Sequence, residues 1–310
     1  MYKESIPILR VEGKCLVGEM TRPRWSAQRR LEFIEFRLYW EGRVNRSDLT
    51  DFFGISVPQA SADLTTYQQM AEGNMVYDKT AKAYVAGPRF VPVFFVPSAD
   101  RYLAELQLLD TGLLSSEESR VGRLPAHSVL PILRRRVDPW TLRYVLDAIR
   151  TSSSVEVRYQ SFSRPEPTWR RLTPHALAFD GLRWHVRAWC HTRARFLDFV
   201  MGRILEVRDP QPDAVDPSSD VGWNFTVVLK IGPHPKLTGG TRSVTELDYG
   251  MENGVLEVTT RACMVPYLER LIGLDQNPEE VDPKEQQIVL LNRDEVARAL
   301  LASGVTGVGQ

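Results

Sequence analysis

The chain has 310 residues, which is enough for two or three domains, and its 39 basic residues balance its 39 acidic residues. A net charge of zero argues against a protein that coats nucleic acid indiscriminately, although it allows local basic patches. No run of about 18 apolar residues is present, so we expect neither a membrane-spanning helix nor a membrane partner.

The three cysteines, Cys15, Cys190 and Cys263, lie far apart, and no cysteine or histidine cluster has the spacing of metal ligands. We therefore expect no disulfide, no metal site and no cofactor. The amino-terminal stretch lacks the long apolar core of a signal peptide, and a cytoplasmic location is expected. Residues 1–25 read as a basic arm that leads into the first helix, and their role stays open.

Two helices are predicted after this arm. The first begins at Ser26, ends before Gly42, and has an apolar stripe made of Leu31, Ile34, Phe36, Leu38 and Tyr39. The second spans residues 47–53, with Ser47 as its N-cap and Gly54 at its end, where glycine often follows a helix.

A third helix and a hairpin complete a winged helix-turn-helix pattern. Ser56 caps the helix of residues 57–70, and Pro58 sits in its first turn, where proline is well tolerated. A helix, a glycine-containing turn and a second capped helix form the helix-turn-helix arrangement. The alternation in residues 74–86 predicts a hairpin, the wing, with a basic tip at Lys79 and Lys82.

The third helix is a candidate for reading DNA. Its inward stripe is Ala60, Leu64, Tyr67 and Ala71, which leaves short polar side chains on the outer face. Glutamine pairs well with adenine, and serine or threonine can contact bases or phosphates. The expected contacts to double-stranded DNA are Arg29, Arg46, Ser47, Ser56, Pro58, Gln59, Ser61, Thr65, Lys79 and Lys82. Arg30 and Arg43 add phosphate attraction, and a purely structural or protein-binding winged helix is the alternative.

The middle of the chain is rich in arginine. Residues 158–203 hold nine arginines, three acids and three of the five histidines. Between residues 182 and 190, one alternating set (Leu182, Trp184, Val186, Ala188, Cys190) shares a face and the other (Arg183, His185, Arg187, Trp189) points away. Short strands that gather arginine, hydroxyl and histidine side chains suit a phosphate-bearing ligand, because the guanidinium fork matches phosphate geometry.

This segment resembles a WYL domain, a small Sm-like β-barrel module of bacterial transcription regulators. Trp184 stands in the name-giving triplet, with His185 and Val186 in place of its Tyr and Leu. Further matches are Gly181, Tyr159-x-Ser161-x-Ser163, Pro174-His175-x-Leu177 and Arg195-Phe196-x-Asp198-x-x-x-x-Arg203. The resemblance implies effector binding at Tyr159, Ser161, Ser163, His175, Trp184, Arg187, Arg195, Asp198 and Arg203, with Asp198 orienting an arginine.

The remaining residues predict a small α+β domain with strands at 225–231 and 255–260 and a helix at 266–272. It is similar to the C-terminal extension that often follows WYL domains, through Pro233-His234-x-x-Leu237, Asp248-Tyr249-Gly250-Met251 and Arg261-Ala262. His234, in a turn, is interpreted as structural rather than as a ligand.

These elements predict an α+β multidomain chain. Its parts are an N-terminal arm and winged helix-turn-helix (1–96), a helical linker (97–137), a WYL-like sensing domain with its leading helix (138–212) and a C-terminal α+β extension (213–310). No enzyme motif is present, neither a phosphate-cradling glycine loop nor a G-x-S-x-G elbow nor HExxH, and no catalytic residue is expected.

The resemblance over nearly the whole chain points to a homodimeric repressor of a bacterial phage-defence operon. Such a regulator binds an inverted repeat and is released by an effector, here a nucleotide or short nucleic acid. A DNA-damage-responsive activator and an accessory protein that holds single strands are the alternatives. The operator, the effector, the operon and the sign of regulation are not encoded in any residue pattern.

Overall fold

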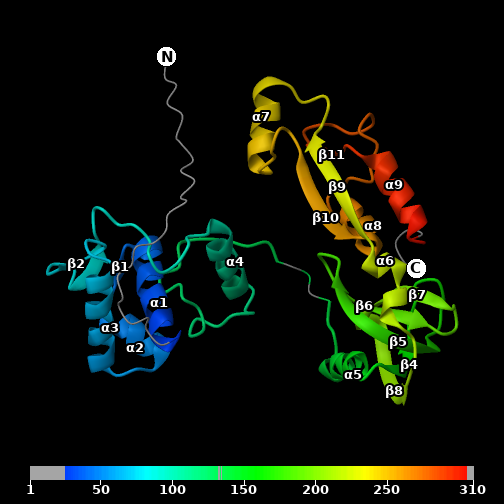
Figure 1. The fold of residues 1–310 in the computed structure, drawn as a ribbon, viewed down its shortest axis with the longest axis horizontal. Coiled ribbons are helices and arrows are strands. Elements are labelled where there is room, and N and C mark those ends of the chain that lie inside the picture. The colour runs from blue at the N-terminus through cyan, green and yellow to red at the C-terminus, as the bar shows by residue number, and fades with distance from the viewer. Residues whose placement is uncertain (1–24, 132, 134, 306–310) are drawn as a thin grey trace. The chain divides into compact units, whose positions relative to one another are not determined.

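The computed structural model describes residues 25–131, 133 and 135–305. The basic arm predicted for residues 1–25 therefore lies outside the described residues, apart from Trp25. The chain folds into two compact units, Met1–Ile132 and Leu133–Gln310, which are taken in turn (Figure 1). No helix in the described ranges is long and apolar enough to cross a membrane.

The first unit contains the expected winged helix-turn-helix. Its helices are α1 (Trp25–Glu41), α2 (Arg46–Phe53), α3 (Val57–Met70) and α4 (Ala99–Asp110). Its antiparallel sheet has the order β1-β3-β2, with β1 at Arg43–Val44, β2 at Met75–Asp78 and β3 at Ala83–Ala86. The predicted inward stripe of α3 is confirmed, because Ala60, Leu64, Tyr67 and Ala71 are all buried. In α1 the predicted stripe is buried except for Tyr39, which is 43% exposed.

The helix caps follow the sequence with one correction. Ser56 caps α3 as predicted, and its hydroxyl accepts the Gln59 amide at 3.4 Å. The N-cap of α2 is Asn45 and not Ser47, because the Asn45 amide donates to the Asp48 carboxylate at 2.6 Å in the first turn. Gly54 ends α2 in the left-handed region, at φ 63°.

Residues 97–131, expected as part of a linker, pack onto the winged helix. A second apolar cluster joins Phe36 of α1 to Leu106 of α4 and to Val121, which are all buried. The buried Glu35 adds an anchor, since its carboxylate accepts the amides of Val93, Phe94 and Phe95 at 2.6–3.0 Å. The chain passes to the second compact unit only after residue 132.

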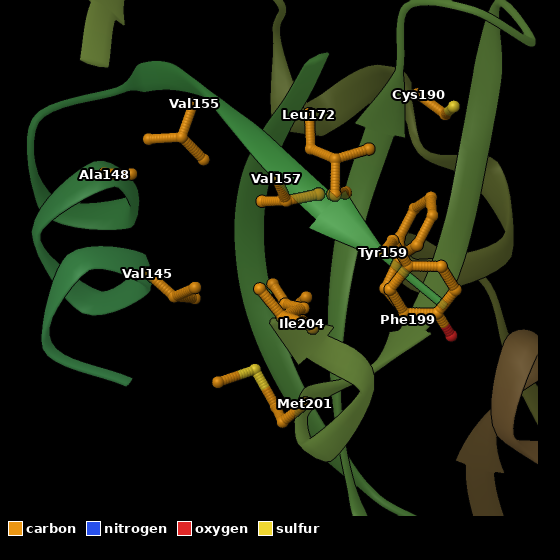
Figure 2. Close-up of a cluster of buried hydrophobic side chains, with 12 residues drawn as sticks. Val145, Ala148, Val155, Val157, Tyr159, Leu172, Cys190, Phe199, Met201 and Ile204 are labelled. Carbon is orange, nitrogen blue, oxygen red and sulfur yellow. The ribbon is translucent and has the colours of Figure 1, made fainter. Parts of the chain in front are cut away.

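The second unit starts with α5 (Pro139–Arg150), which packs on a five-stranded antiparallel sheet. The sheet has the order β7-β6-β5-β4-β8, and its strands are β4 (Ser153–Tyr159), β5 (Thr168–Phe179), β6 (Trp184–Cys190), β7 (Arg195–Val200) and β8 (Ile204–Pro212). In Figure 2, Val145 and Ala148 of α5 face Val155 and Val157 of β4. Within the described ranges the edge strands β7 and β8 share no ladder, so the expected barrel closure is not found.

The alternation predicted for β6 is confirmed for Val186, Ala188 and Cys190, which are buried in the sheet core. Trp184, from the same set, is 49% exposed and contacts the Phe179 ring at a tilt at the strand end instead. On the opposite face Arg187 is also buried, because the chain beyond β8 covers it. A strand covered on both faces departs from the half-exposed strand that alternation predicts.

The chain beyond β8 forms the predicted α+β extension. It contains η2 (Pro217–Ser219), α6 (Val221–Asn224), β9 (Thr226–Pro233), α7 (Gly239–Asp248), β10 (Leu256–Arg261), η3 (Ala262–Met264), α8 (Val265–Leu271), β11 (Ile288–Leu290) and α9 (Arg293–Ala302). The strands form an antiparallel sheet of order β10-β9-β11. His234 is fully buried; its Nδ1 accepts the Lys236 amide at 3.2 Å and its Nε2 donates to the Pro278 carbonyl at 2.9 Å, so its role is structural.

Candidate DNA-binding and effector sites

The outer face of α3 presents hydrogen-bond acceptors. Ser61 donates its hydroxyl to the Val57 carbonyl at 3.0 Å, and Thr65 donates to the Ser61 carbonyl at 2.9 Å. Because a hydroxyl has one proton, both side chains offer only oxygen lone pairs to a partner. They are therefore suited to accept from the amino groups of adenine or cytosine in a major groove.

A bidentate ion pair fixes α3 against α1. Arg30 donates to both carboxylate oxygens of Asp63, at 2.7 and 3.2 Å, and Asp63 also accepts from the Gln59 amide at 3.1 Å. Arg30 was expected to attract phosphate, but its guanidinium is engaged in positioning the helix. Gln59 keeps its carbonyl oxygen and one amide proton for a base edge.

The remaining predicted DNA contacts are surface residues of the first unit. Arg46, Ser47, Ser56 and Pro58 are exposed at the starts of α2 and α3, where the helix dipole favours anions. Lys79 and Lys82 are exposed at the wing tip. Arg29 instead lines a hollow of about 520 Å³ together with α2 and α4 residues.

The candidate effector site is a cavity of about 550 Å³ in the second unit, between β7 and the start and end of the C-terminal extension. Four arginines and three aromatic side chains from the sheet and its β6–β7 turn line it: Arg170, Arg187, Arg193, Arg195, Trp189, Phe196 and Phe199. The extension contributes Asp220, Gly222, Cys263 and residues 303–305. A basic, partly aromatic lining of this size suits a nucleotide-sized anion.

A buried chain of charges crosses from the sheet to the extension beside this cavity. Arg187 donates to both oxygens of Asp220, at 2.7 and 2.9 Å, and to Asp198 at 3.3 Å. His175 contacts the same Asp220 carboxylate at 2.9 Å, and the Tyr267 hydroxyl donates to Asp198 at 3.2 Å. Each half of the unit thus supplies a donor to a carboxylate of the other half.

The charged groups of this buried network stabilise one another in their ionised forms. Burial acts to raise the pKa of Asp220, but hydrogen bonds from Arg187 and His175 outweigh it and lower the pKa to about 2. Burial likewise works against the charged form of Arg187, and the two carboxylates still raise its pKa above the usual value. Burial raises the pKa of the Cys263 thiol to about 12, so this cavity-lining cysteine is a poor nucleophile.

The other cavity arginines have no carboxylate partner within the described ranges. Arg193 and Arg195 are exposed on the turn into β7 and at its start, and Arg170 donates to the Thr168 hydroxyl at 3.3 Å. Burial, together with the charges of neighbouring arginines, lowers the pKa of Arg170. Three guanidinium groups without a paired carboxylate in the described ranges leave local positive charge that an anion would neutralise.

Of the nine predicted effector residues, the structure brings Arg187, Arg195 and Asp198 to this cavity. His175 reaches it only through Asp220. Tyr159 is in the sheet core, 2% exposed, and its hydroxyl accepts the Val200 amide at 3.2 Å. Ser161 and Ser163 contact each other, Trp184 contacts the Phe179 ring at a tilt, and Arg203 lies over the Phe162 ring at 3.9 Å.

Among the lining residues that the sequence reasoning missed are two arginines, two aromatic residues and one acid: Arg170, Arg193, Trp189, Phe196 and Asp220. The sequence pattern held a signal for two of them. Arg193 lies two residues before the predicted Arg195, and Trp189 belongs to the same alternating set of β6 as the predicted Arg187. Asp220 had no local signal. Throughout the described ranges, no group of three or more His, Cys, Asp and Glu side chains is placed to hold a metal ion.

Three stretches of the chain match known domain families. Residues 26–108 match the BrxR transcriptional regulator winged helix-turn-helix domain, residues 140–209 the WYL domain, and residues 226–296 the BrxR transcriptional regulator C-terminal dimerization domain. A DNA-binding transcriptional repressor CapW from Stenotrophomonas maltophilia is 46% identical over 279 residues, which are 89% of this chain and 93% of that protein. The chain belongs to the CapW family of DNA-binding transcriptional repressors.

Other CapW repressors are similar over the same extent. The protein from Escherichia coli strain KTE188 is 39% identical, and that from Pseudomonas aeruginosa is 41% identical, each over 88% of this chain and 91% of the relative. The expected regulator with a winged helix, a WYL domain and a C-terminal extension is thereby confirmed. The CapW family is one of DNA-binding repressors and not of enzymes.

Proposed function

We propose that this CapW family member is a homodimeric repressor that binds an inverted-repeat operator and leaves it when a phosphorylated effector occupies the WYL cavity. The cavity carries the proposal, because Arg170, Arg193 and Arg195 line it without a carboxylate partner in the described part of the chain. The effector is a nucleotide or a short nucleic acid, whose phosphate the arginines neutralise and whose base stacks on Trp189 or Phe196.

The DNA half of the proposal rests on α3. Gln59, Ser61 and Thr65 would contact base edges, while Arg46 and the wing lysines would contact phosphates. In a two-fold dimer the two α3 helices enter major grooves one helical turn, or a multiple of it, apart. That geometry is why an inverted repeat is proposed as the operator.

Release follows from competition for the buried charges. A phosphate entering the cavity would lie near Asp198 and Asp220, and repulsion would weaken their hold on Arg187. If the effector prefers one arrangement of the two DNA-binding domains by about 1.4 kcal/mol, operator affinity changes by only about tenfold. Useful derepression therefore needs a preference of roughly 2–3 kcal/mol. Losing one buried charge pair is large enough to supply that difference.

A phage-defence operon is the proposed target, and the cytoplasm the proposed location, since the chain resembles repressors of such operons over nearly its whole length. The arginine-rich sheet is proposed to curl toward an Sm-like barrel, because β4 carries two register shifts against β8 that permit curvature. An experimental structure with β7 hydrogen-bonded to β8 would establish closure.

A gel-shift assay tests the function. The protein should bind one inverted repeat near its own or a neighbouring gene far better than random duplex, with the preference retained at moderate salt. Gln59→Ala should weaken this binding without unfolding the protein. Equal affinity for every duplex would instead indicate an accessory nucleic-acid-binding protein, and transcription that rises with bound protein would indicate an activator.

A second arm tests the effector site. Nucleotides and short oligonucleotides are titrated into the protein–operator complex, and one class should release the wild type. Arg193→Ala with Arg195→Ala should bind the operator normally but resist release, whereas the control Arg298→Ala on α9 should behave as wild type. If the cavity variants lose operator binding outright, the proposed division between the two units is wrong.

A further inference from the structure

Helix α7 packs on β9 of its own unit along one side only. Of its ten residues only Thr245 is buried, while Val244 is 50% exposed and Leu247 is 77% exposed. Val244 and Leu247 are three residues apart, so they lie on one face of the helix. Within residues 226–296, Leu247 is the most exposed large hydrophobic side chain.

The sequence of α7 does not explain why it is a helix. It begins with two glycines, of which Gly239 has φ 53°, and it also contains the β-branched residues Thr241, Val244 and Thr245. Both glycine and β-branched residues disfavour helix. Its hydroxyls donate back to helix carbonyls, and its one side-chain ion pair, Arg242 with Glu246 at 2.8 Å, contributes only a few tenths of a kcal/mol. Isolated helices shorter than about 12 residues are marginal in water, so α7 depends on packing, which its own unit supplies on the Thr245 side.

We propose that α7 packs against α7 of a second copy of this chain, about a two-fold axis. The matched C-terminal dimerization family spans residues 226–296 and so contains α7. The outer face of the neighbouring sheet is a poorer interface, because the polar side chains Thr226, Lys230, Glu257 and Thr259 surround its one exposed valine, Val228, which is 39% exposed. This inference rests on the proposed homodimer and names the surface that forms it.

The composition of α7 fits a self-complementary contact. In a two-fold interface the same patch meets itself, so Val244 and Leu247 would cover their counterparts. Gly240 lies one turn before Val244, and a side chain added there would meet no atom within 4 Å, so a second helix can approach closely. Arg242 and Glu246 then lie at the rim, where their opposite charges can pair across the axis.

Sedimentation equilibrium of the full chain tests this surface. Leu247→Arg should raise the dimer dissociation constant at least about a hundredfold, because the substitution places a charge on both sides of the axis. Leu301→Arg is the matched control, since Leu301 is a helical leucine in α9 with 76% exposure, outside the matched dimerization range. Val244→Glu provides a second variant, and far-UV circular dichroism verifies that each variant is folded.

The outcomes separate the two levels of the proposal. A wild type that is monomeric at every concentration overturns the homodimer itself. A dimeric wild type with an equally dimeric Leu247→Arg protein overturns only the assignment to α7. Loss of the dimer in both Leu247→Arg and Leu301→Arg would mean that charge at any exposed leucine dissociates the chains, which also overturns the α7 surface.

Discussion

Replacing Asp220 by asparagine should destabilise the second compact unit strongly, although the two side chains have nearly the same shape. Asp220 is 1% exposed and accepts from Arg187, from His175 and, at 3.1 Å, from the Trp223 amide at the start of α6. Asparagine can keep the last contact but cannot carry the charge that faces Arg187. The buried guanidinium is then left with Asp198 as its one carboxylate partner within the described ranges.

The magnitude follows from the lowered pKa of the Asp220 carboxyl. A pKa of about 2 against the ordinary 3.8 corresponds to roughly 2.5 kcal/mol of the free energy of unfolding at neutral pH. Because the folded pKa is the lower one, this contribution is complete above about pH 4 and is lost as the pH falls through about 2. Removing one partner of a buried pair generally costs about 3–5 kcal/mol, so we expect a loss of roughly 2–4 kcal/mol.

Urea unfolding monitored by tryptophan fluorescence measures the change, since five of the seven tryptophans lie in the second unit. Asp147→Asn is the matched control, because Asp147 pairs with Arg150 on the exposed side of α5 and exposed pairs are worth under about 1 kcal/mol. The gap between wild type and Asp220→Asn should narrow as the pH is lowered from 4 toward 2. Equal midpoints for the two variants at neutral pH would refute the reasoning.

Three further changes test the first unit. Glu35→Gln should lower the thermal midpoint by the equivalent of roughly 2–4 kcal/mol of unfolding free energy. The carboxylate accepts from three backbone amides and the Tyr67 hydroxyl, whereas an amide side chain has only one acceptor oxygen. An unchanged midpoint would contradict this. Gly54→Ala should cost about 1 kcal/mol in urea unfolding, since its φ of 63° is strained for alanine while no atom lies within 4 Å; a loss above about 3 kcal/mol would indicate a clash instead. Lys79→Ala should reduce the salt slope of operator binding by about one, as read from gel shifts at several salt concentrations; an unchanged slope would remove the wing tip from the interface.

Local patterns predicted the elements well wherever a single segment decides the outcome. The caps at Ser56 and Gly54 and the buried stripe of α3 were all readable from spacing. Asn45 displaced Ser47 as the cap of α2 because Asp48 completes a reciprocal contact with Asn45 and not with Ser47. The packing of residues 97–131 was missed, since a short helix and a polar segment give no local sign of the surface they cover.

The effector site stays a prediction, and the structure brings only some of its predicted residues together. Arginine density marked the sheet, and Arg187, Arg195 and Asp198 line the cavity beside it. The family motif also marked Tyr159, whose ring is used in the core. Neutralisation of Arg187 depends on Asp220, 33 positions later in the chain, and no periodicity within either segment encodes such a contact.

The contact of Asp220 with Arg187 of the sheet also affects where such repressors can be truncated or joined in chimeras. The matched WYL family ends at residue 209, eleven residues before the carboxylate that neutralises the arginine of β6. A fragment trimmed at that boundary would lose both Asp220 and the segment that covers Arg187, so this charged face of the sheet would be opened to solvent with Asp198 as the remaining carboxylate. Chimeras that exchange sensory segments between relatives should therefore carry the α6 turn along with the sheet.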